Sequence, residues 1–170
     1  MENQTAHTGK RPKNRACLLT MRQSLSVRPR YTVYRGGMQA VYTVEGDITR
    51  HVYAIRKDGA EVMKLRKKRA RLLPAYTLEK DGHEIAQIKK RISLLTHDLC
   101  GTFGDLPLEI RPDWDAYRFD ILLNGRKLCH IEQNTAGLSD SYAITVFDES
   151  METLAVGLAV ICDRVSDSVE

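Results

Sequence analysis

The chain has 170 residues and a mass of 19.3 kDa, long enough to bury a sizeable core and too short for two ordinary domains. Hydrophobic residues make up 42% and charged residues 28%, which excludes disordered, collagen-like and fibrous chains. The net charge of +4 is unevenly spread: residues 1–71 carry 17 Lys and Arg against 5 Asp and Glu, and residues 72–170 carry 9 against 17. This polarity predicts one face for an anionic partner.

The sequence shows no segment that would carry the chain into or across a membrane. No window reaches about 18 consecutive apolar residues, and the polar, basic start lacks the apolar core of a secretory signal. We therefore expect a cytoplasmic protein without a transmembrane segment, peripheral at most at the inner face of the membrane. The four cysteines (Cys17, Cys100, Cys129 and Cys162) lack metal-ligand spacing, so we expect free thiols, no metal and no cofactor.

The chain divides into a tail and one domain. Residues 1–16 are polar and basic without apolar periodicity, which predicts a disordered tail, and residues 17–170 form a single domain. Short runs rich in β-branched and aromatic residues then follow, each the length of a strand, and together they contain all seven tyrosines. These runs are residues 31–34, 41–44, 52–55, 76–78, 85–88, 106–110, 117–123, 128–131 and 142–147.

The turns between these runs recur regularly. Asp58-Gly59 and Asp81-Gly82 lie 23 residues apart, and Tyr53 and Tyr76 precede them at the same spacing. Both dipeptides, like Gly36-Gly37 and Asn124-Gly125, favour the positive φ angles of tight hairpin turns. The repeat therefore predicts a series of β-hairpins.

The last segment has a different pattern. After Asp148-Glu149-Ser150, a helix start signal, nine consecutive apolar residues run from Leu154 to Cys162. Small residues within this run favour a helix over about 151–165, rather than the alternative of a buried strand. A helix that is apolar on every side must be enclosed, and this run is too short to span a bilayer.

The hairpins and the apolar helix together predict one architecture. A series of hairpins removes its unpaired edges by closing, and an apolar helix needs walls around it. We therefore predict a mainly β (α+β) fold, in which a closed antiparallel β-barrel built from hairpin repeats wraps around a hydrophobic C-terminal helix. A chain cut before Met151 should lose its packed core.

Several motifs also carry a family resemblance. The stretch Leu73-Pro74-Ala75-Tyr76-Thr77-Leu78, with Asp81-Gly82 and Ile85–Arg91, resembles the central motif of the LURP-one-related family in the tubby C-terminal-like superfamily. Trp114-Asp115 and Asp140-Ser141-Tyr142 are similar to later hairpins of that family, so the resemblance runs from about Cys17 to Val165. It implies a barrel of about twelve strands around the helix, related to phosphoinositide-binding tubby domains and phospholipid scramblases.

A group of basic residues is the most conspicuous local feature. Residues 66, 67 and 68 become 89, 90 and 91 when the 23-residue repeat is added, so we expect them at equivalent places on neighbouring hairpins. Crowded cations repel one another, and phosphate relieves that repulsion. We name this group the basic cluster: Lys64, Arg66, Lys67, Lys68, Lys89, Lys90 and Arg91.

Two other interpretations of the basic cluster stay open. It can be a solvated face that keeps strand edges from aggregating. Alternatively, Glu61–Leu73 can form a basic amphipathic helix suited to a membrane or a partner, although the 23-residue repeat argues against a helix there.

These features predict a non-enzymatic barrel domain. We expect it to bind anionic phospholipid headgroups, such as a phosphoinositide-like lipid or an anionic membrane surface, or similar phosphate-bearing ligands at the basic cluster. The alternative is a scaffold that recruits an acidic protein, with no role for lipid. Nucleic acid is disfavoured because no helix-turn-helix, zinc-finger or RNA-recognition signature occurs. No catalytic motif occurs either, and Asp113, Asp115 and Asp120 read as turn and capping residues.

Overall fold

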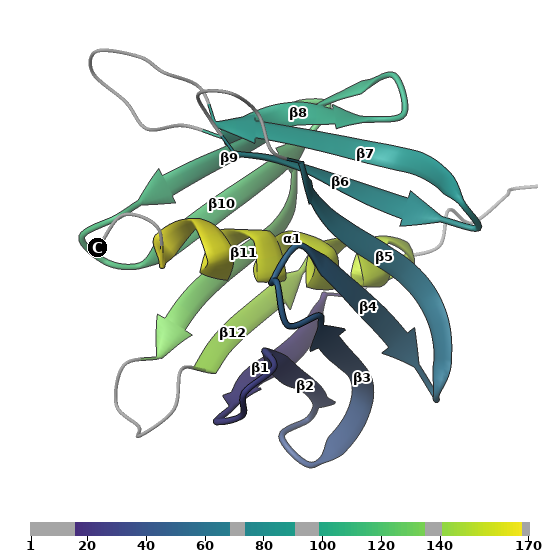
Figure 1. The fold of residues 1–170 in the computed structure, drawn as a ribbon. Helices are drawn as coiled ribbons and strands as arrows, with labels where there is room; N and C mark the ends of the chain where they lie inside the picture. The colour runs from purple at the N-terminus through teal and green to yellow at the C-terminus, as the bar shows by residue number, and fades with distance from the viewer. Residues whose placement is uncertain (1–15, 69–73, 91–98, 135–140, 168–170) are drawn as a thin grey trace, which may run out of the picture.

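A computed structural model describes residues 16–68, 74–90, 99–134 and 141–167 (Figure 1). The predicted tail, apart from residue 16, and Arg91 of the basic cluster therefore lie outside the described residues. Twelve antiparallel strands form a closed barrel, in which each strand pairs with its neighbours in the chain and β1 pairs with β12. The predicted closed barrel built from hairpins is confirmed.

The strands follow one another around the barrel in chain order, without a crossover. They are β1 (Cys17–Ser24), β2 (Arg30–Arg35), β3 (Gln39–Gly46), β4 (Val52–Lys57), β5 (Ala60–Lys68), β6 (Ala75–Lys80), β7 (His83–Lys90), β8 (Leu99–Phe103), β9 (Leu106–Asp113), β10 (Arg118–Leu123), β11 (Arg126–Asn134) and β12 (Ser141–Val146).

One helix, α1 (Glu152–Ser166), runs through the barrel (Figure 1). A short 3₁₀ turn, η1 (Glu149–Met151), leads into it, and the Asp148 carboxylate accepts a hydrogen bond from the Ser150 backbone N–H at 3.1 Å. Nearly all of α1 is buried, from its first residue to Val165. The helix predicted over about 151–165 is confirmed, and the surrounding strands explain why it has no polar face.

The hairpin repeat is visible in the strands themselves. Strands β4 and β6 start 23 residues apart, as do β5 and β7. The Asp58-Gly59 turn has φ values of 50° and 81°, and the equivalent Asp81-Gly82 turn has 51° and 78°. Residues with positive φ at both central positions give a turn whose twist matches that of the paired strands. Local turn chemistry therefore places each hairpin.

Three strands, β1, β5 and β8, are missing from the nine runs predicted as strands, and β8 is the one whose tight turn the dipeptide pattern also missed. Gly82 and Gly125 lie 43 residues apart, close to two repeats, and the hairpin of β8 with β9, which turns at Gly104 with a φ of 55°, lies between them. Strand β8 has only five residues, and Gly101 at its centre weakens the strand pattern. A Cβ atom at Gly101 would lie 1.8 Å from the backbone oxygen of Gln87 on β7, so the close approach of β7 and β8 requires glycine there.

Two other expectations need correction. Residues 60–68 are strand β5, so the helical alternative for Glu61–Leu73 is wrong over 61–68, and residues 69–73 lie outside the described residues. Packing of Met63 and Leu65 into the barrel, at the period of two typical of a strand, decides against the helix. The run 117–123 predicts a strand that starts at Tyr117, but Tyr117 lies in the turn before β10, with a φ of 48°, and is partly exposed.

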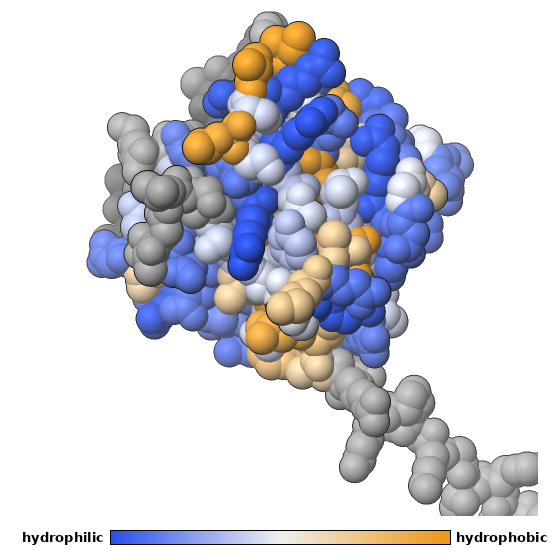
Figure 2. Space-filling model, turned by 90° about the horizontal axis from the view of Figure 1, so that it is seen from below, coloured by the Kyte–Doolittle hydropathy of each residue, from blue (hydrophilic) through white to orange (hydrophobic). Residues whose placement is uncertain are grey.

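The outer surface contrasts with this apolar interior. Seen from below the view of Figure 1, it is mostly hydrophilic, with separate hydrophobic groups standing among charged ones (Figure 2). The interior is lined by one face of every strand and filled by α1. Binding to other molecules therefore falls to the outer surface and to the two ends of the barrel.

Candidate functional site

The basic cluster lies towards the end of the barrel at which α1 finishes, which we call the C-terminal end. Strands β5 and β7 both finish there. The Lys67 backbone N–H donates a hydrogen bond to the His51 carbonyl oxygen at 2.7 Å, which ties the end of β5 to the loop before β4. Tyr31, near the start of β2, reaches Asp163 in the last turns of α1. The end of β5, the start of β2 and the last turns of α1 therefore all lie at the C-terminal end of the barrel.

The strand register places two parts of the basic cluster next to each other. Lys68 on β5 pairs with Ala75 on β6, and Ala75 pairs in turn with Lys89 on β7. Since neighbouring strands lie about 4.8 Å apart, the two lysine backbones are separated by roughly 10 Å. The small side chain between them, that of Ala75, is buried. Long lysine side chains can converge over such a gap.

Half of the described cluster is already paired with acidic side chains. The Arg66 guanidinium contacts Glu79 at 2.9 Å, and the Lys68 ammonium contacts Glu84 at 2.8 Å. Lys64 contacts Glu61 at 3.2 Å. Because all six side chains are partly exposed, each pair contributes only about 0–1 kcal/mol and can open to another anion.

The other half of the described cluster has no salt bridge to a described residue. It consists of Lys67, Lys89 and Lys90. Lys89 is exposed, and Lys67 and Lys90 are half-buried because the alternation along their strands turns them towards the mouth of the barrel. The unbalanced positive charge therefore concentrates at the C-terminal end.

Lys64 and Arg66 occupy a different environment. They line a surface hollow of about 280 Å³ whose wall also contains Glu61, Glu79 and Asp81. The acidic side chains offset the positive charge, so this hollow does not suit an anion.

Two buried carboxylates at the ends of α1 are functional groups that our sequence analysis did not single out. The first is Asp163, whose carboxylate accepts hydrogen bonds from the Tyr31 hydroxyl at 2.5 Å and the Tyr142 hydroxyl at 2.7 Å. Arg164 donates to the same carboxylate at 2.6 and 2.9 Å, and also contacts Asp167 at 2.6 Å. The network fixes the last turns of α1 against β2 and β12.

Tyrosines at equivalent places in the repeat surround this network. Tyr31, Tyr53, Tyr76 and Tyr142 are each the second residue of their strands, and all are almost completely buried. Burial raises the pKa of Tyr76 to about 12, with a further contribution from neighbouring Tyr53, so the phenols stay neutral. The spacing of the tyrosines was visible in the sequence. Asp163, the carboxylate that Tyr31 and Tyr142 bind, lies over twenty residues beyond Tyr142, so no local pattern pointed to it.

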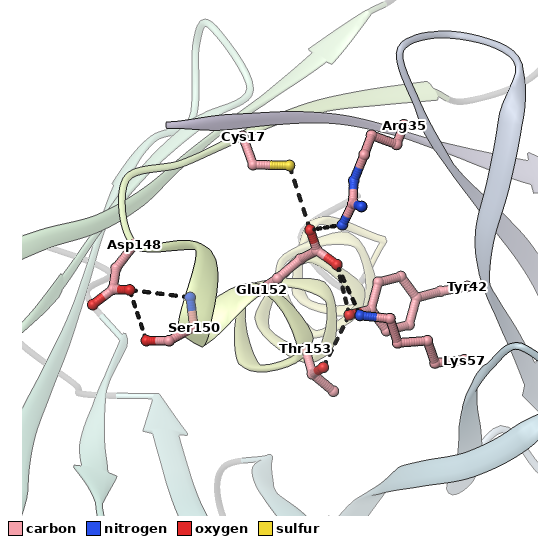
Figure 3. A network of polar contacts seen from close by, with 8 residues as sticks. All are labelled: Cys17, Arg35, Tyr42, Lys57, Asp148, Ser150, Glu152 and Thr153. Carbon is pink, nitrogen blue, oxygen red and sulfur yellow. Dashed lines mark hydrogen bonds and ion pairs between the residues drawn. The ribbon is translucent and has the colours of Figure 1, made fainter. Parts of the chain in front are cut away.

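The second carboxylate, Glu152, lies at the opposite end of the barrel (Figure 3). Side chains from four consecutive strands point towards it: Cys17 from β1, Arg35 from β2, Tyr42 from β3 and Lys57 from β4. The Tyr42 hydroxyl donates to it at 2.8 Å, Lys57 lies at 3.5 Å, and Arg35 forms an ion pair with it. A carboxylate in the first turn also interacts favourably with the helix dipole.

The contacts around Glu152 lower the pKa of its carboxyl group. Burial by itself would raise that pKa, but hydrogen bonds from Tyr42, Arg35 and Cys17, together with the charge of Arg35, hold it below the usual value. Burial, followed by the contact with Glu152, raises the pKa of the Cys17 thiol. The thiol therefore stays protonated at neutral pH and is a poor nucleophile.

Glu152→Gln is expected to lower the free energy of unfolding at pH 7 by about 1–3 kcal/mol, because it removes a charged acceptor of several hydrogen bonds. Since the folded state lowers the pKa of Glu152, its stabilising effect is complete above pH 4.5 and disappears as the pH falls through the folded-state value. Urea unfolding of both proteins at pH 7 and pH 3 measures the difference. A gap that stays constant or widens at low pH would contradict this prediction.

Several other titratable groups are paired or buried. The Asp120 carboxylate contacts His130 at 2.9 Å and Lys127 at 3.2 Å on the outside of the barrel. Burial raises the pKa of Cys129 and Cys162 well above the usual thiol value. Within the part of the chain that the structure describes, no three His, Cys, Asp or Glu side chains are grouped so that they could hold a metal ion.

The fold and these contacts define a class of protein: a closed twelve-stranded antiparallel barrel that encloses its own C-terminal helix. Residues 17–163 match the LURP-one-related family, and the chain belongs to this family. A comparison with curated proteins gave no match. None of the described helices is both long and apolar enough to cross a membrane.

Proposed function

We propose that the protein acts by binding, without catalysis, and that its ligand is an anionic phospholipid headgroup or a similar phosphate-bearing group. The observation that carries this proposal is the concentration of lysines where β5 and β7 end. Lys67, Lys89 and Lys90 have no acidic partner among the described residues, and Lys68 has only an exposed one. Phosphate would relieve their mutual repulsion.

The chemistry of lysine suits this role. Its ammonium group is a compact charge on a flexible stem, so it contacts phosphate as a point charge without a fixed geometry. The side chains of Lys68 and Lys89 start about 10 Å apart, far enough to bind two phosphates or to meet over one. The rigid barrel holds both strands, so binding needs no rearrangement of the backbone.

Charge reversal at the two lysines tests the proposal. Lys68→Glu combined with Lys89→Glu is expected to weaken binding to vesicles of phosphatidylcholine and phosphatidylserine by about 30-fold or more. Each basic residue near such a surface contributes about 1 kcal/mol, and reversal adds repulsion to that loss. Cosedimentation across a salt series measures the effect, and binding by the unmodified protein should fall as salt rises.

Lys80→Glu combined with Arg126→Glu is the matched control. Both residues are exposed at the opposite end of the barrel, and the pair changes the net charge by the same amount. If both double variants lost the same amount of vesicle binding, the loss would be explained by net charge alone, which would contradict a site at the C-terminal end. Equal binding to neutral and anionic vesicles would contradict the proposal itself and favour recruitment of an acidic protein.

A further inference from the structure

Two loops at the C-terminal end expose large apolar side chains. Leu25 and Val27, between β1 and β2, are each 90% exposed, and Ile48, between β3 and β4, is 67% exposed. A single exposed apolar residue is ordinary on a soluble surface. Three such residues at the tips of neighbouring loops are a feature typical of an interaction site.

Backbone hydrogen bonds link the two loops, through the end of β3, to the strand that carries Lys67. The Gly46 backbone N–H donates to the Pro29 carbonyl oxygen at 2.8 Å, which joins the first loop to the end of β3, where the second loop begins. The second loop joins the end of β5 through the hydrogen bond between Lys67 and His51. The apolar tips and the lysines therefore form one continuous arc along the C-terminal end.

The loop between β3 and β4 is held in a defined shape. The Asp47 carboxylate accepts hydrogen bonds from the backbone N–H groups of His51 at 2.8 Å and Val52 at 3.1 Å, and from the Thr49 hydroxyl at 2.5 Å. Arg50 adopts the left-handed conformation, with a φ of 58°. These bonds keep Ile48 at the tip, where it projects into solvent.

Positive charges flank the apolar tips. Arg28 follows Val27 directly, Arg50 lies two residues beyond Ile48, and both arginines are exposed. The space-filling view shows hydrophobic groups placed directly beside strongly hydrophilic ones on the outer surface (Figure 2). Apolar tips bordered by cations complement the boundary between headgroups and acyl chains of an anionic bilayer, where apolar burial and charge attraction act together.

We infer that the apolar tips of these two loops insert into the surface of an anionic membrane while the lysines of β5 and β7 contact its phosphates. This inference rests on the proposed function and narrows it, because it requires a bilayer rather than a free phosphate compound. Leu25, Val27 and Ile48 enter the interfacial layer from one side of the arc. The headgroups are bound on the other side by Lys67, Lys68, Lys89 and Lys90.

Replacing all three apolar side chains by serine tests how much they contribute to the affinity for vesicles. The variant Leu25→Ser, Val27→Ser and Ile48→Ser is expected to bind vesicles of phosphatidylcholine and phosphatidylserine about tenfold or more weakly, because it loses apolar burial. The salt dependence should be unchanged, since no charge is altered. Met38→Ser is the control, because Met38 is 91% exposed in the turn between β2 and β3 at the opposite end.

A spectroscopic measurement tests insertion directly. The emission of the Ile48→Trp variant is expected to shift to shorter wavelength with these vesicles and to be quenched by brominated phosphatidylcholine. Met38→Trp should show neither change. The signal of the native Trp114 is subtracted by use of the unmodified protein.

The outcomes separate this inference from the proposed function. If the serine variant binds vesicles normally and the emission of the Ile48→Trp variant does not change, while the reversal of Lys68 and Lys89 abolishes binding, insertion is wrong and the headgroup site stands. Binding of soluble inositol trisphosphate without binding to vesicles would likewise overturn insertion alone. If the unmodified protein binds neither, both are overturned.

Discussion

Asp163→Ala is expected to lower the free energy of unfolding by about 3–5 kcal/mol, the usual cost of removing one partner of a buried ion pair. Asp163 is completely buried and accepts hydrogen bonds from Tyr31, Tyr142 and Arg164. Its loss leaves two buried hydroxyls without that acceptor, and leaves Arg164, only 8% exposed, with a single carboxylate at the surface. Thermal unfolding should shift down by roughly 10 °C.

Asp167→Ala is the matched control for this prediction. Asp167 contacts the same Arg164 at 2.6 Å, but its side chain is 49% exposed. Water can replace the exposed carboxylate, so a loss of about 0–1 kcal/mol is expected. Chemical denaturation of the two variants separates burial from charge: similar small losses would show that the Asp163 network does not anchor α1.

Removal of α1 is expected to have the largest effect of all. A chain that ends at Ser150 keeps every strand but loses the helix that fills the barrel. Burial of each large aliphatic side chain contributes about 1.5–3 kcal/mol, and α1 buries six: Leu154, Val156, Leu158, Val160, Ile161 and Val165. Their combined contribution is comparable with the whole stability of an ordinary domain, about 5–15 kcal/mol.

The shortened chain should therefore be insoluble or lack a cooperative unfolding transition. Calorimetry and binding of a hydrophobic dye measure this, because strands without packed side chains leave apolar surface accessible. A chain that ends at Asp167 keeps α1 whole and serves as the control. A soluble chain ending at Ser150 with a sharp transition would mean that the barrel folds without its central helix.

The two buried carboxylates give α1 a fixed position along the barrel. Glu152 binds side chains of β1 to β4 at one end, and Asp163 binds tyrosines of β2 and β12 at the other. Apolar packing alone is not directional, so it would let the helix slide or rotate. Hydrogen bonds with defined geometry at both ends specify one arrangement.

Much of the architecture could be predicted from the sequence because it depends on residues that are close together in the chain. Asp-Gly and Asn-Gly turns favour positive φ wherever they occur, and alternating apolar residues predict strands with one buried face. A continuous apolar run of helical composition requires enclosure. The closed barrel, the repeat and the enclosed helix therefore follow from the sequence without knowledge of which strands meet.

The site depends on contacts between residues distant in the chain, which no local pattern reports. Only the register of β5, β6 and β7 shows that Arg66 is paired with Glu79 while Lys89 is unpaired among the described residues. Similarly, only the closed barrel brings Asp163 to Tyr31, and only the folded chain joins Pro29, in the loop after β1, to Gly46 at the end of β3. The sequence alone therefore determined the barrel and its helix through turn chemistry and periodicity. Tertiary structure decided which charges are balanced, because pairing depends on distances set by the assembled strands.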